Sequence, residues 1–393
     1  RQRQMCIRDS PMPRSAVFHT SSIQKQVAAL SDAFAIAGEF LHCDVINSGH
    51  INMTFRATYR KPDGTTRRYI FQRVNDAVFP CPKDVMHNVE KVTNHIRWKM
   101  LRVLKTPFRQ TLNLYSARGG RKYLEIPGSG FWRCYNCIEN THTFDVADHP
   151  RQAYEAARAF GAFQQLLCDM NPEDIHETIP FFHHTRRRFD HLEKAAAADS
   201  HGRLNTCRKE LDFIRRRERY VDVLLDLQER GELPVRIVHN DTKINNVMLD
   251  RETDKAVCVI DLDTVMPGSV LYDFGDMVRT MTSPAAEDEE NLDKTFLRMP
   301  MFEAVVKGYL EASREFITPQ EVSKLAFSGL LITLETGIRF LTDYLEGDVY
   351  FKTKKERHNL HRARTQLRLV ESMEEQMPEM EECVRKCFQT VNG

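Results

Sequence analysis

The residues best suited to chemistry lie in one short stretch, residues 238–246 (VHNDTKINN). Phosphoryl transfer needs a carboxylate that orients an acceptor hydroxyl and takes its proton, and a nearby ligand that holds Mg²⁺ on the phosphates. An aspartate, a lysine and an asparagine at this spacing can supply both. We therefore expect Asp241 to be the catalytic base, Lys243 to face the transferred phosphoryl group, and Asn246 to bind Mg²⁺. His239 is expected to brace the loop through hydrogen bonds.

A second acidic element follows at a spacing that suits the same chemistry. Residues 257–260 (VCVI) form an apolar run that ends at Asp261. A turn within residues 250–254 would fold this run back beside the loop that carries Asp241. An acid at the mouth of a buried strand can bridge Mg²⁺ to nucleotide phosphates. Asp261 is therefore predicted as the second metal ligand, beside Asn246.

Residues 273–275 (DFG) spell the metal-binding triplet of protein kinases. The triplet lies far beyond Asn246 and does not end an apolar strand. Tyr272 and Phe274 suggest core contacts at the start of a helix. We therefore predict a structural role for this triplet.

Composition limits the class of protein. The chain has 393 residues, with 56 Lys and Arg against 55 Asp and Glu, so its formal net charge is only +1. That balance lacks the basic footprint of a nucleic-acid binder, and no apolar run approaches the roughly 18–20 residues that span a bilayer. The ten cysteines are scattered and do not form a disulfide framework. We expect a cytoplasmic protein with neither a nucleic-acid nor a membrane partner.

The beginning of the chain differs from the rest. Residues 5–10 (MCIRDS) resemble the translation of a transposase mosaic end used in sequencing libraries. Residues 1–10 have no apolar h-region and do not form a signal peptide. Residues 1–21 are therefore expected to be a disordered or artefactual preamble.

The next segment, residues 22–137, carries mostly strand patterns. Apolar residues at helical spacing predict helices over residues 27–34 and 85–96. Alternating apolar residues predict strands over residues 52–59, 68–74, 112–115, 122–126 and 131–137. A turn signal at residues 62–64 (PDG) joins the first two strands. This segment is therefore a small, mostly β lobe with an inserted helix.

The remainder, residues 138–393, is mainly helical. Helices are predicted over residues 153–167 and 211–227, and short strands over residues 234–239, 246–249 and 256–260. Thr318 and Glu321 form a candidate capping box that starts a later helix. The sequence therefore predicts an α+β fold of two lobes, the first small and β-rich, the second larger and mainly helical. A cleft between two such lobes is a natural ligand site.

Residues 238–276 resemble the aminoglycoside phosphotransferase and choline kinase superfamily. The similarity covers nearly the whole chain after the preamble and is closer to the N-acetylhexosamine 1-kinase group. The segments that favour this group are residues 49–52 (GHIN), 267–269 (PGS), 339–341 (RFL) and 343–348 (DYLEGD). The loop motif is specific for the superfamily, whereas the sugar kinase group is favoured only by these segments taken together.

The resemblance implies a bilobal, protein-kinase-like fold and an enzyme that uses ATP and Mg²⁺. Residues 22–137 would be the nucleotide-binding lobe, and residues 138–393 the catalytic and substrate-binding lobe. The implied reaction phosphorylates the anomeric hydroxyl of N-acetylglucosamine or N-acetylgalactosamine, and we expect a monomer. Asp241 matches the catalytic base and Asp261 the metal-binding acid. The positions that match sugar contacts are His50, Asp241, Lys243, Arg339, Asp343, Tyr344 and Tyr350.

The nucleotide contacts in the first lobe depart from the protein-kinase pattern. Ser48 and Gly49 make a thin phosphate loop with one glycine. Gln72 stands where a protein kinase carries its phosphate-binding lysine. Either Arg73 serves in its place, or the phosphates are held mainly by metal and backbone. The adenine is expected to bond to the backbone where the lobes join, at Cys137, Ile138 and Glu139.

Two other functions stay open. A sibling kinase of the same superfamily could act on another hydroxyl, such as that of an aminoglycoside, choline or a different hexose. Alternatively, the chain could be a catalytically dead nucleotide-binding regulator. Intact Asp241, Asn246 and Asp261 argue against the second alternative, since a dead relative has no chemical need for all three.

Overall fold

The computed structural model describes residues 20–46, 52–103 and 111–392. Its internal contacts divide the chain into two compact units. The first contains Arg1–Asn75 and Leu114–Cys137, and the second contains Asp76–Asn113 and Ile138–Gly393. Each unit has a hydrophobic core of its own.

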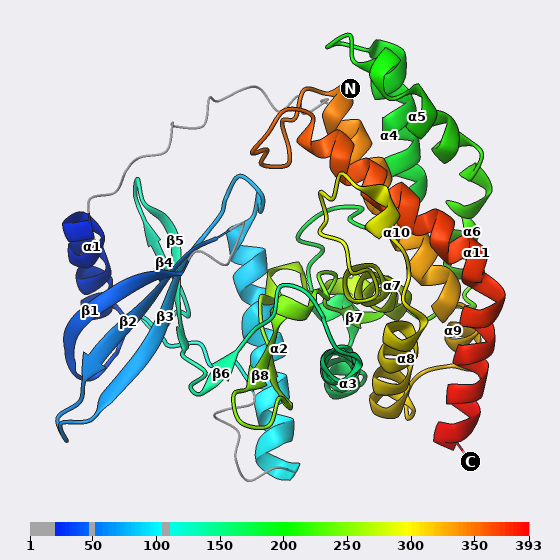
Figure 1. Cartoon of the computed structure of the whole chain (residues 1–393). Coiled ribbons are helices and arrows are strands. Elements are labelled where there is room, and N and C mark those ends of the chain that lie inside the picture. The colour runs from blue at the N-terminus through cyan, green and yellow to red at the C-terminus, as the bar shows by residue number, and fades with distance from the viewer. Residues whose placement is uncertain (1–19, 47–51, 104–110, 393) are drawn as a thin grey trace. The chain divides into compact units, whose positions relative to one another are not determined.

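The first unit is built on an antiparallel sheet of five strands in the order β1-β2-β3-β5-β4, shown with helix α1 in Figure 1. Its elements are α1 (Thr20–Ala33), β1 (Glu39–Ile46), β2 (Met53–Arg60), β3 (Thr66–Val74), β4 (Leu124–Ile126) and β5 (Gly130–Asn136). The PDG turn between β2 and β3 forms as predicted, and Gly64 adopts a left-handed φ of 80° there.

One face of this sheet carries the core of the first unit. Phe55 pairs with Phe71 across β2 and β3, and Phe71 pairs with Cys134 across β3 and β5. All three are buried in one cluster with Leu30 of α1 and with Phe34, which directly follows α1. Because side chains alternate along a strand, the intervening residues lie on the opposite face.

The strands predicted for this unit were mostly confirmed, whereas the inserted helix expected over residues 85–96 forms as Pro82–Val103 and belongs to the second unit. The strands at residues 52–59, 68–74 and 131–137 form as β2, β3 and β5. The strand expected over residues 112–115 was wrong, because only Leu114 makes an isolated bridge, to Tyr135. Strand β1 was missed, since Cys43 is its one buried residue and the strand shows no apolar alternation.

The second unit is mainly helical. Its helices are α2 (Pro82–Val103), α3 (Pro150–Leu167), α4 (Thr185–Ala198), α5 (Arg208–Arg215), α6 (Val223–Glu229), α7 (Val270–Met281), α8 (Met299–Ser313), α9 (Pro319–Val322), α10 (Leu325–Leu345) and α11 (His358–Asn392). Its strands are β6 (Thr141–His142), β7 (Arg236–Val238), β8 (Val247–Asp250), β9 (Ala256–Val259) and β10 (Met266–Gly268). Together the two units form the predicted α+β architecture.

Helix α10 runs through the core of the second unit and lies beside α11 (Figure 1). Within the described part of the chain it is the one helix long and apolar enough to cross a membrane, yet 89% of its apolar window is buried by the rest of the unit. Its contact with α7 is close, because a Cβ on Gly275 would lie 2.4 Å from the Ser328 carbonyl oxygen. The apolar composition of α10 therefore reflects a core position.

Two predictions for the helical unit had different outcomes. The capping box was confirmed, with Glu321 N–H donating to Thr318 Oγ1 at 3.2 Å. The single helix expected over residues 211–227 was wrong, because α5 ends at Arg215 and α6 begins at Val223. A short 3-10 turn, Glu218–Tyr220, separates them. The charged run of residues 215–219 interrupts the apolar spacing that helix continuity needs.

Candidate active site

The predicted catalytic loop follows β7 and is held by a buried aspartate, Asp273 of α7. Asp273 accepts hydrogen bonds from the backbone N–H groups of His239 and Asn240, at 2.8 and 2.6 Å. Its own carbonyl accepts from Thr242 Oγ1 at 2.6 Å. Asn240 has a left-handed φ of 62°, a conformation that asparagine tolerates better than most residues. The DFG triplet therefore has the structural role that was predicted for it, since Asp273 fixes the loop.

The predicted brace, His239, joins the loop to the strand that precedes Asp261. Its Nε2 lies 2.9 Å from the Ile260 carbonyl oxygen, and its own carbonyl accepts from Thr264 Oγ1 at 2.7 Å. The ring packs edge-on against Phe160 and Phe163. His239 is fully buried, so it fixes the position of the loop and is not exposed to a substrate.

Asp241 lies at the centre of a small polar cluster. Lys243 Nζ is 3.1 Å from its Oδ1, and Asn246 Nδ2 donates to its Oδ2 at 3.0 Å. Burial raises the pKa of Asp241, but the positive charge of Lys243, the electrostatic effect of His239 and the hydrogen bonds from Lys243 and Asn246 outweigh burial and hold the pKa below its usual value. The carboxylate is therefore ionised at neutral pH and able to accept a proton.

Asn246 and Asp261 lie together at the open end of the β8–β9 hairpin. Val247 pairs with Val259, and Ile260 N–H donates to the Asn246 carbonyl at 2.9 Å. Asp261 has φ 61° and ψ 59°, a left-handed conformation that costs energy for a residue with a Cβ. Strain of this kind at the end of a strand indicates that the position of the carboxylate is constrained.

The donor set suits a magnesium ion that also binds phosphate. Asn246 uses Nδ2 to bond Asp241, so its Oδ1 is the amide atom left to act as a metal ligand. Among the described residues, no cluster of three or more His, Cys, Asp and Glu side chains could hold a metal without other ligands. Magnesium is commonly bound by one or two protein oxygens together with substrate phosphates and water. Asn246 and Asp261 fit that pattern.

Asp276 is an acidic residue of this site that the sequence reasoning missed. Its Oδ1 accepts from Arg279 Nη2 at 2.8 Å, while its Oδ2 is buried and has no hydrogen-bond partner among the described residues. The charges of Asp241, Asp261 and Asp276 all raise the pKa of Lys243, with Asp241 the largest contributor. The ammonium group of Lys243 is therefore charged. Asp276 directly follows the DFG triplet, and this position next to Asp273 is the sequence feature that could have pointed to it.

The predicted sugar-binding residues of the second unit have different environments. Arg339 lies over the rings of Phe182 and Phe351, at 5.2 and 5.6 Å. Tyr350 is 60% exposed, with its ring edge-on to Phe351. Both therefore have atoms within reach of a ligand.

Asp343 and Tyr344 bond to the protein itself. Asp343 accepts from three successive backbone N–H groups, those of Val349, Tyr350 and Phe351, at 2.7–2.9 Å. Tyr344 is buried, with its hydroxyl 2.8 Å from Thr206 Oγ1. These contacts fix the segment that carries Tyr350.

Arg188 adds a second guanidinium beside Arg339 and was not predicted. Its Nη2 donates to the Phe182 carbonyl at 2.9 Å, so both arginines contact Phe182. Burial and the nearby charge of Arg339 lower the pKa of Arg188. Its Nε is buried and has no hydrogen-bond partner in the described residues. Two guanidinium groups therefore lie beside Phe182.

In the first unit, Gln72 bonds to a buried arginine. Gln72 pairs with Arg133 across β3 and β5, and its Oε1 accepts from Arg133 Nε and Nη2 at 3.1 and 2.8 Å. Both lie on the face opposite the core, by alternation from Phe71. Arg73 lies on the core face, and its Nε would be 3.0 Å from a Cβ at Gly130. The cation beside the position of the kinase lysine is therefore Arg133.

The other predicted nucleotide contacts are only partly visible. Ser48 and Gly49 lie outside the described residues, as does His50, which was predicted to contact the sugar. Where the chain passes from the first unit to the second, Cys137 N–H donates to the Arg68 carbonyl, and the Ile138 carbonyl accepts from Thr141 Oγ1. Glu139 is exposed.

A small antiparallel β unit followed by a larger helical unit with a polar loop after β7 defines a kinase-like fold. Residues 42–305 match the model of the APH family, described as "Phosphotransferase enzyme family". Because this match covers more than half of the 393 residues, the chain belongs to the phosphotransferase enzyme family.

Solved structures share this fold at low sequence identity. An aminoglycoside phosphotransferase from Alicyclobacillus acidocaldarius is 12% identical, with a TM-score of 0.56 and 98% of each chain covered. A microcompartment-associated aminopropanol kinase is 14% identical, with a TM-score of 0.52 and 91% of this chain and 98% of that chain covered. A choline kinase from Cryptosporidium parvum is 11% identical, with a TM-score of 0.51 and 90% and 96% covered. These similarities establish the fold.

Proposed function

We propose that the protein is an ATP- and Mg²⁺-dependent kinase that phosphorylates the anomeric hydroxyl of an N-acetylhexosamine. The observation that carries the chemistry is Asp241, ionised and held between Lys243 and Asn246. Membership of the phosphotransferase family supports the reaction class. The sugar is proposed on the resemblance of the segments around residues 49–52 and 339–348 to N-acetylhexosamine 1-kinases.

The reaction follows from the loop geometry. As the acceptor oxygen attacks the γ-phosphorus of ATP, its proton passes to the Asp241 carboxylate, and the bond between the γ-phosphorus and the ADP oxygen breaks. Lys243 is charged and 39% exposed, so it can contact the transferred phosphoryl group while it bonds to Asp241. Mg²⁺ held by Asn246 and Asp261 would neutralise phosphate charge. The products are ADP and a sugar 1-phosphate.

The charges around Arg339 favour a neutral acceptor over a cationic one. Choline and aminoglycosides carry positive charge, and the guanidinium groups of Arg188 and Arg339 would repel them even after the ionised Glu335 offsets one of the two charges. A sugar offers ring hydroxyls and, when N-acetylated, a carbonyl oxygen that accepts hydrogen bonds. Tyr350 adds an exposed aromatic ring of the kind that packs against a sugar face.

For the nucleotide, we assign Arg133 to the role of the missing lysine. The guanidinium of Arg133 is permanently charged, and although the side chain is 1% exposed, that charge attracts nearby phosphates. Gln72 orients Arg133 from the neighbouring strand at the position where protein kinases have the lysine. Arg73 lies on the other face of the sheet and is the weaker candidate.

The test is an ATP-consumption assay with several acceptors in parallel, namely N-acetylglucosamine, N-acetylgalactosamine, galactose, kanamycin and choline. Turnover with the N-acetylated sugars and an acid-labile sugar 1-phosphate as product would support the proposal. Turnover with another acceptor alone would retain the chemistry and overturn the substrate. ATP binding without turnover on any acceptor would favour the inactive regulator. The proposed cytoplasmic enzyme is a monomer, which size-exclusion chromatography with light scattering tests.

A further inference from the structure

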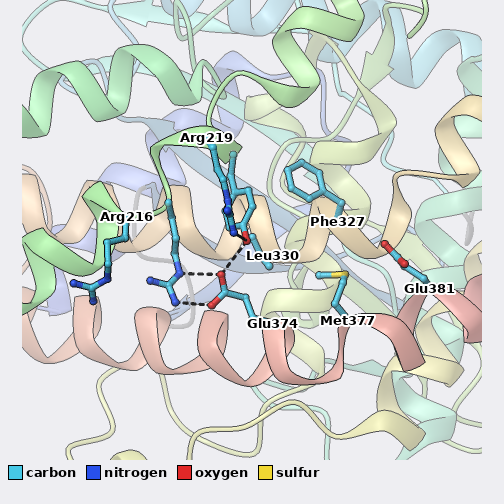
Figure 2. A pocket seen from close by; sticks show the side chains of 9 residues that line it. Arg216, Arg219, Phe327, Leu330, Glu374, Met377 and Glu381 are labelled. Carbon is cyan, nitrogen blue, oxygen red and sulfur yellow. Dashed lines mark hydrogen bonds and ion pairs between the residues drawn. The ribbon is translucent and has the colours of Figure 1, made fainter.

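The second unit contains a pocket that shares no residue with the predicted active site. It lies between the chain after α5, helix α10 and helix α11, and Figure 2 shows its side chains. Its volume is about 490 Å³, within the roughly 300–1,000 Å³ of small-molecule sites. The pocket is lined by Arg216, Arg217, Arg219, Tyr220, Phe327, Leu330, Glu374, Met377 and Glu381.

One end of the pocket is basic and only partly neutralised. Arg217 donates to both carboxylate oxygens of Glu374, at 2.9 and 2.5 Å, and Tyr220 also donates to Glu374. Arg216 and Arg219 are exposed, and neither has a carboxylate partner within the described ranges. Two guanidinium groups are therefore available to an anion, because Glu374 is already occupied by Arg217.

The middle of the pocket is apolar. Phe327 and Leu330 come from α10, and Met377 comes from α11. The ring of Tyr220 meets Phe327 edge-on, with centroids 5.9 Å apart. Figure 2 shows Phe327, Leu330 and Met377 between Glu374 and Glu381. This surface suits a ring or a short aliphatic chain.

The far end offers hydrogen-bond acceptors. Glu381 is exposed, and no ion pair to it occurs in the part of the chain that the structure describes. Pro378 lies inside α11 and has no N–H, so the Glu374 carbonyl lacks its helical donor. Glu374 and Glu381 are seven residues apart on α11, which corresponds to about 10 Å. The pocket is therefore basic at one end and accepts hydrogen bonds along its far side.

We infer that this pocket binds a small organic anion, a phosphate or carboxylate attached to an aromatic or short aliphatic body. Arg216 and Arg219 hold the anionic group, and the body lies on Phe327, Leu330 and Met377. A phosphate alone would leave the apolar surface uncovered, and a neutral ring would leave Arg216 and Arg219 without an anionic partner, since Arg219 bonds only to the neutral hydroxyl of Tyr220 among the described residues. The site lies outside the residues assigned to phosphoryl transfer, so this inference does not depend on the proposed function.

The test is isothermal titration calorimetry on the full chain, with ADP and Mg²⁺ saturating so that nucleotide-site phosphate contacts are filled. The probes are phenyl phosphate and benzoate, with inorganic phosphate and benzyl alcohol as single-feature controls. Phenyl phosphate and benzoate carry the anionic group and the apolar body together, whereas each control carries only one of the two. We therefore expect one aryl anion to bind a single site at least about tenfold more tightly than either control. Which of the two binds better identifies the anionic group.

The variant that tests the location is R216Q/R219Q. We expect it to weaken binding of the preferred aryl anion at least about tenfold while kcat stays unchanged. The matched control is R208Q/K209Q, which removes two exposed charges from α5 outside the pocket and should bind the anion as the wild type does. Absence of saturable binding by both aryl anions would overturn the inference, and so would equal binding by wild type and R216Q/R219Q when both melt at the same temperature.

Discussion

Asn246 donates its side-chain amide to two atoms of Asp241, the carbonyl oxygen at 2.8 Å and the carboxylate Oδ2 at 3.0 Å. These two hydrogen bonds fix the rotamer of Asp241 and leave the Asn246 amide oxygen for a metal. The same asparagine is tied through its backbone carbonyl to Ile260, directly before Asp261. Asn246, itself a predicted metal ligand, therefore connects the predicted base to the other predicted metal ligand, Asp261.

The first prediction concerns Asp241. Asp241→Asn keeps the shape of the side chain and removes the charge that accepts the proton, so kcat should fall about 10²–10⁴-fold, the usual contribution of a general base. ATP affinity should change little, because the metal ligands remain. Steady-state kinetics and nucleotide titration measure the two quantities. The control is Asp226→Asn, an exposed aspartate on α6; near-normal kcat in Asp241→Asn would contradict the assigned role.

The second prediction concerns Asp261 and magnesium. Asp261→Asn should raise the Mg²⁺ concentration needed for half-maximal activity at least about tenfold, because a carboxylate binds this cation more strongly than an amide. Asparagine is chosen because it tolerates the left-handed conformation of this position, φ 61°. Asp254→Asn is the matched control, since Asp254 is also left-handed, φ 53°, and lies in the turn before β9. An unchanged Mg²⁺ requirement would remove Asp261 from the metal site.

The loop that carries Asp241 was predictable from sequence because its determinants are local. His239, Asp241 and Asn246 lie within eight residues, and the β8–β9 hairpin that brings up Asp261 is equally short-range. The two lobes were predictable for a related reason, since strand alternation and helical spacing each report one buried face. These features do not require knowledge of which distant segments meet.

The residues that sequence reasoning missed depend on tertiary contacts. Arg188 is partly buried beside Arg339, about 150 positions away in the sequence. Arg133 is 1% exposed because it pairs with Gln72, 61 positions earlier. Neither pairing leaves a periodic signal. Asp276 was missed because a structural role was predicted for residues 273–275, and the acidic residue that follows them was not considered as part of the site.

The third prediction separates Arg133 from Arg73 as the nucleotide-binding cation. Arg133→Lys should weaken ATP binding by about tenfold, because lysine keeps a charge but cannot keep both hydrogen bonds to Gln72 that position it. Arg73→Lys should bind ATP as the wild type does, since Arg73 lies on the opposite face of the sheet. Nucleotide titration checks both variants, and thermal melting verifies that each is folded. The reverse order of effects would return the role to Arg73.

The fourth prediction concerns the acceptor. Arg188→Gln should raise the KM for the sugar about tenfold and leave the KM for ATP unchanged, because it removes a buried guanidinium that contacts Phe182 beside Arg339. Arg187→Gln is the control, because Arg187 is the exposed neighbour on α4 and lies over Phe181. An equal change in the KM of both substrates would indicate a structural effect on the unit rather than a role at the acceptor.

The fifth prediction concerns pH and the buried pair of His183 and Glu335. Glu335 is 1% exposed and accepts from Thr185 Oγ1 at 2.5 Å and from His183 Nδ1 at 2.8 Å. Burial raises its pKa, but the charge and hydrogen bond of His183, the Thr185 bond and the charge of Arg339 outweigh burial and hold it below the usual 4.5. A lowered pKa means that the ionised carboxylate stabilises the fold above about pH 4.5 and that this stabilisation is lost as the pH falls through the folded-state pKa.

Glu335→Gln should therefore lower the free energy of unfolding by about 1–3 kcal/mol at pH 7, and the deficit relative to wild type should shrink below about pH 4.5. Urea unfolding at pH 7, 5.5 and 4 measures this difference. The matched control is Glu346→Gln, because His191 and Glu346 form the same kind of pair at 2.7 Å with side chains 52% and 38% exposed. An exposed pair contributes about 0–1 kcal/mol, so this variant should be nearly neutral. A Glu335→Gln deficit that stays constant down to pH 4 would show that the charge of Glu335 does not stabilise the fold.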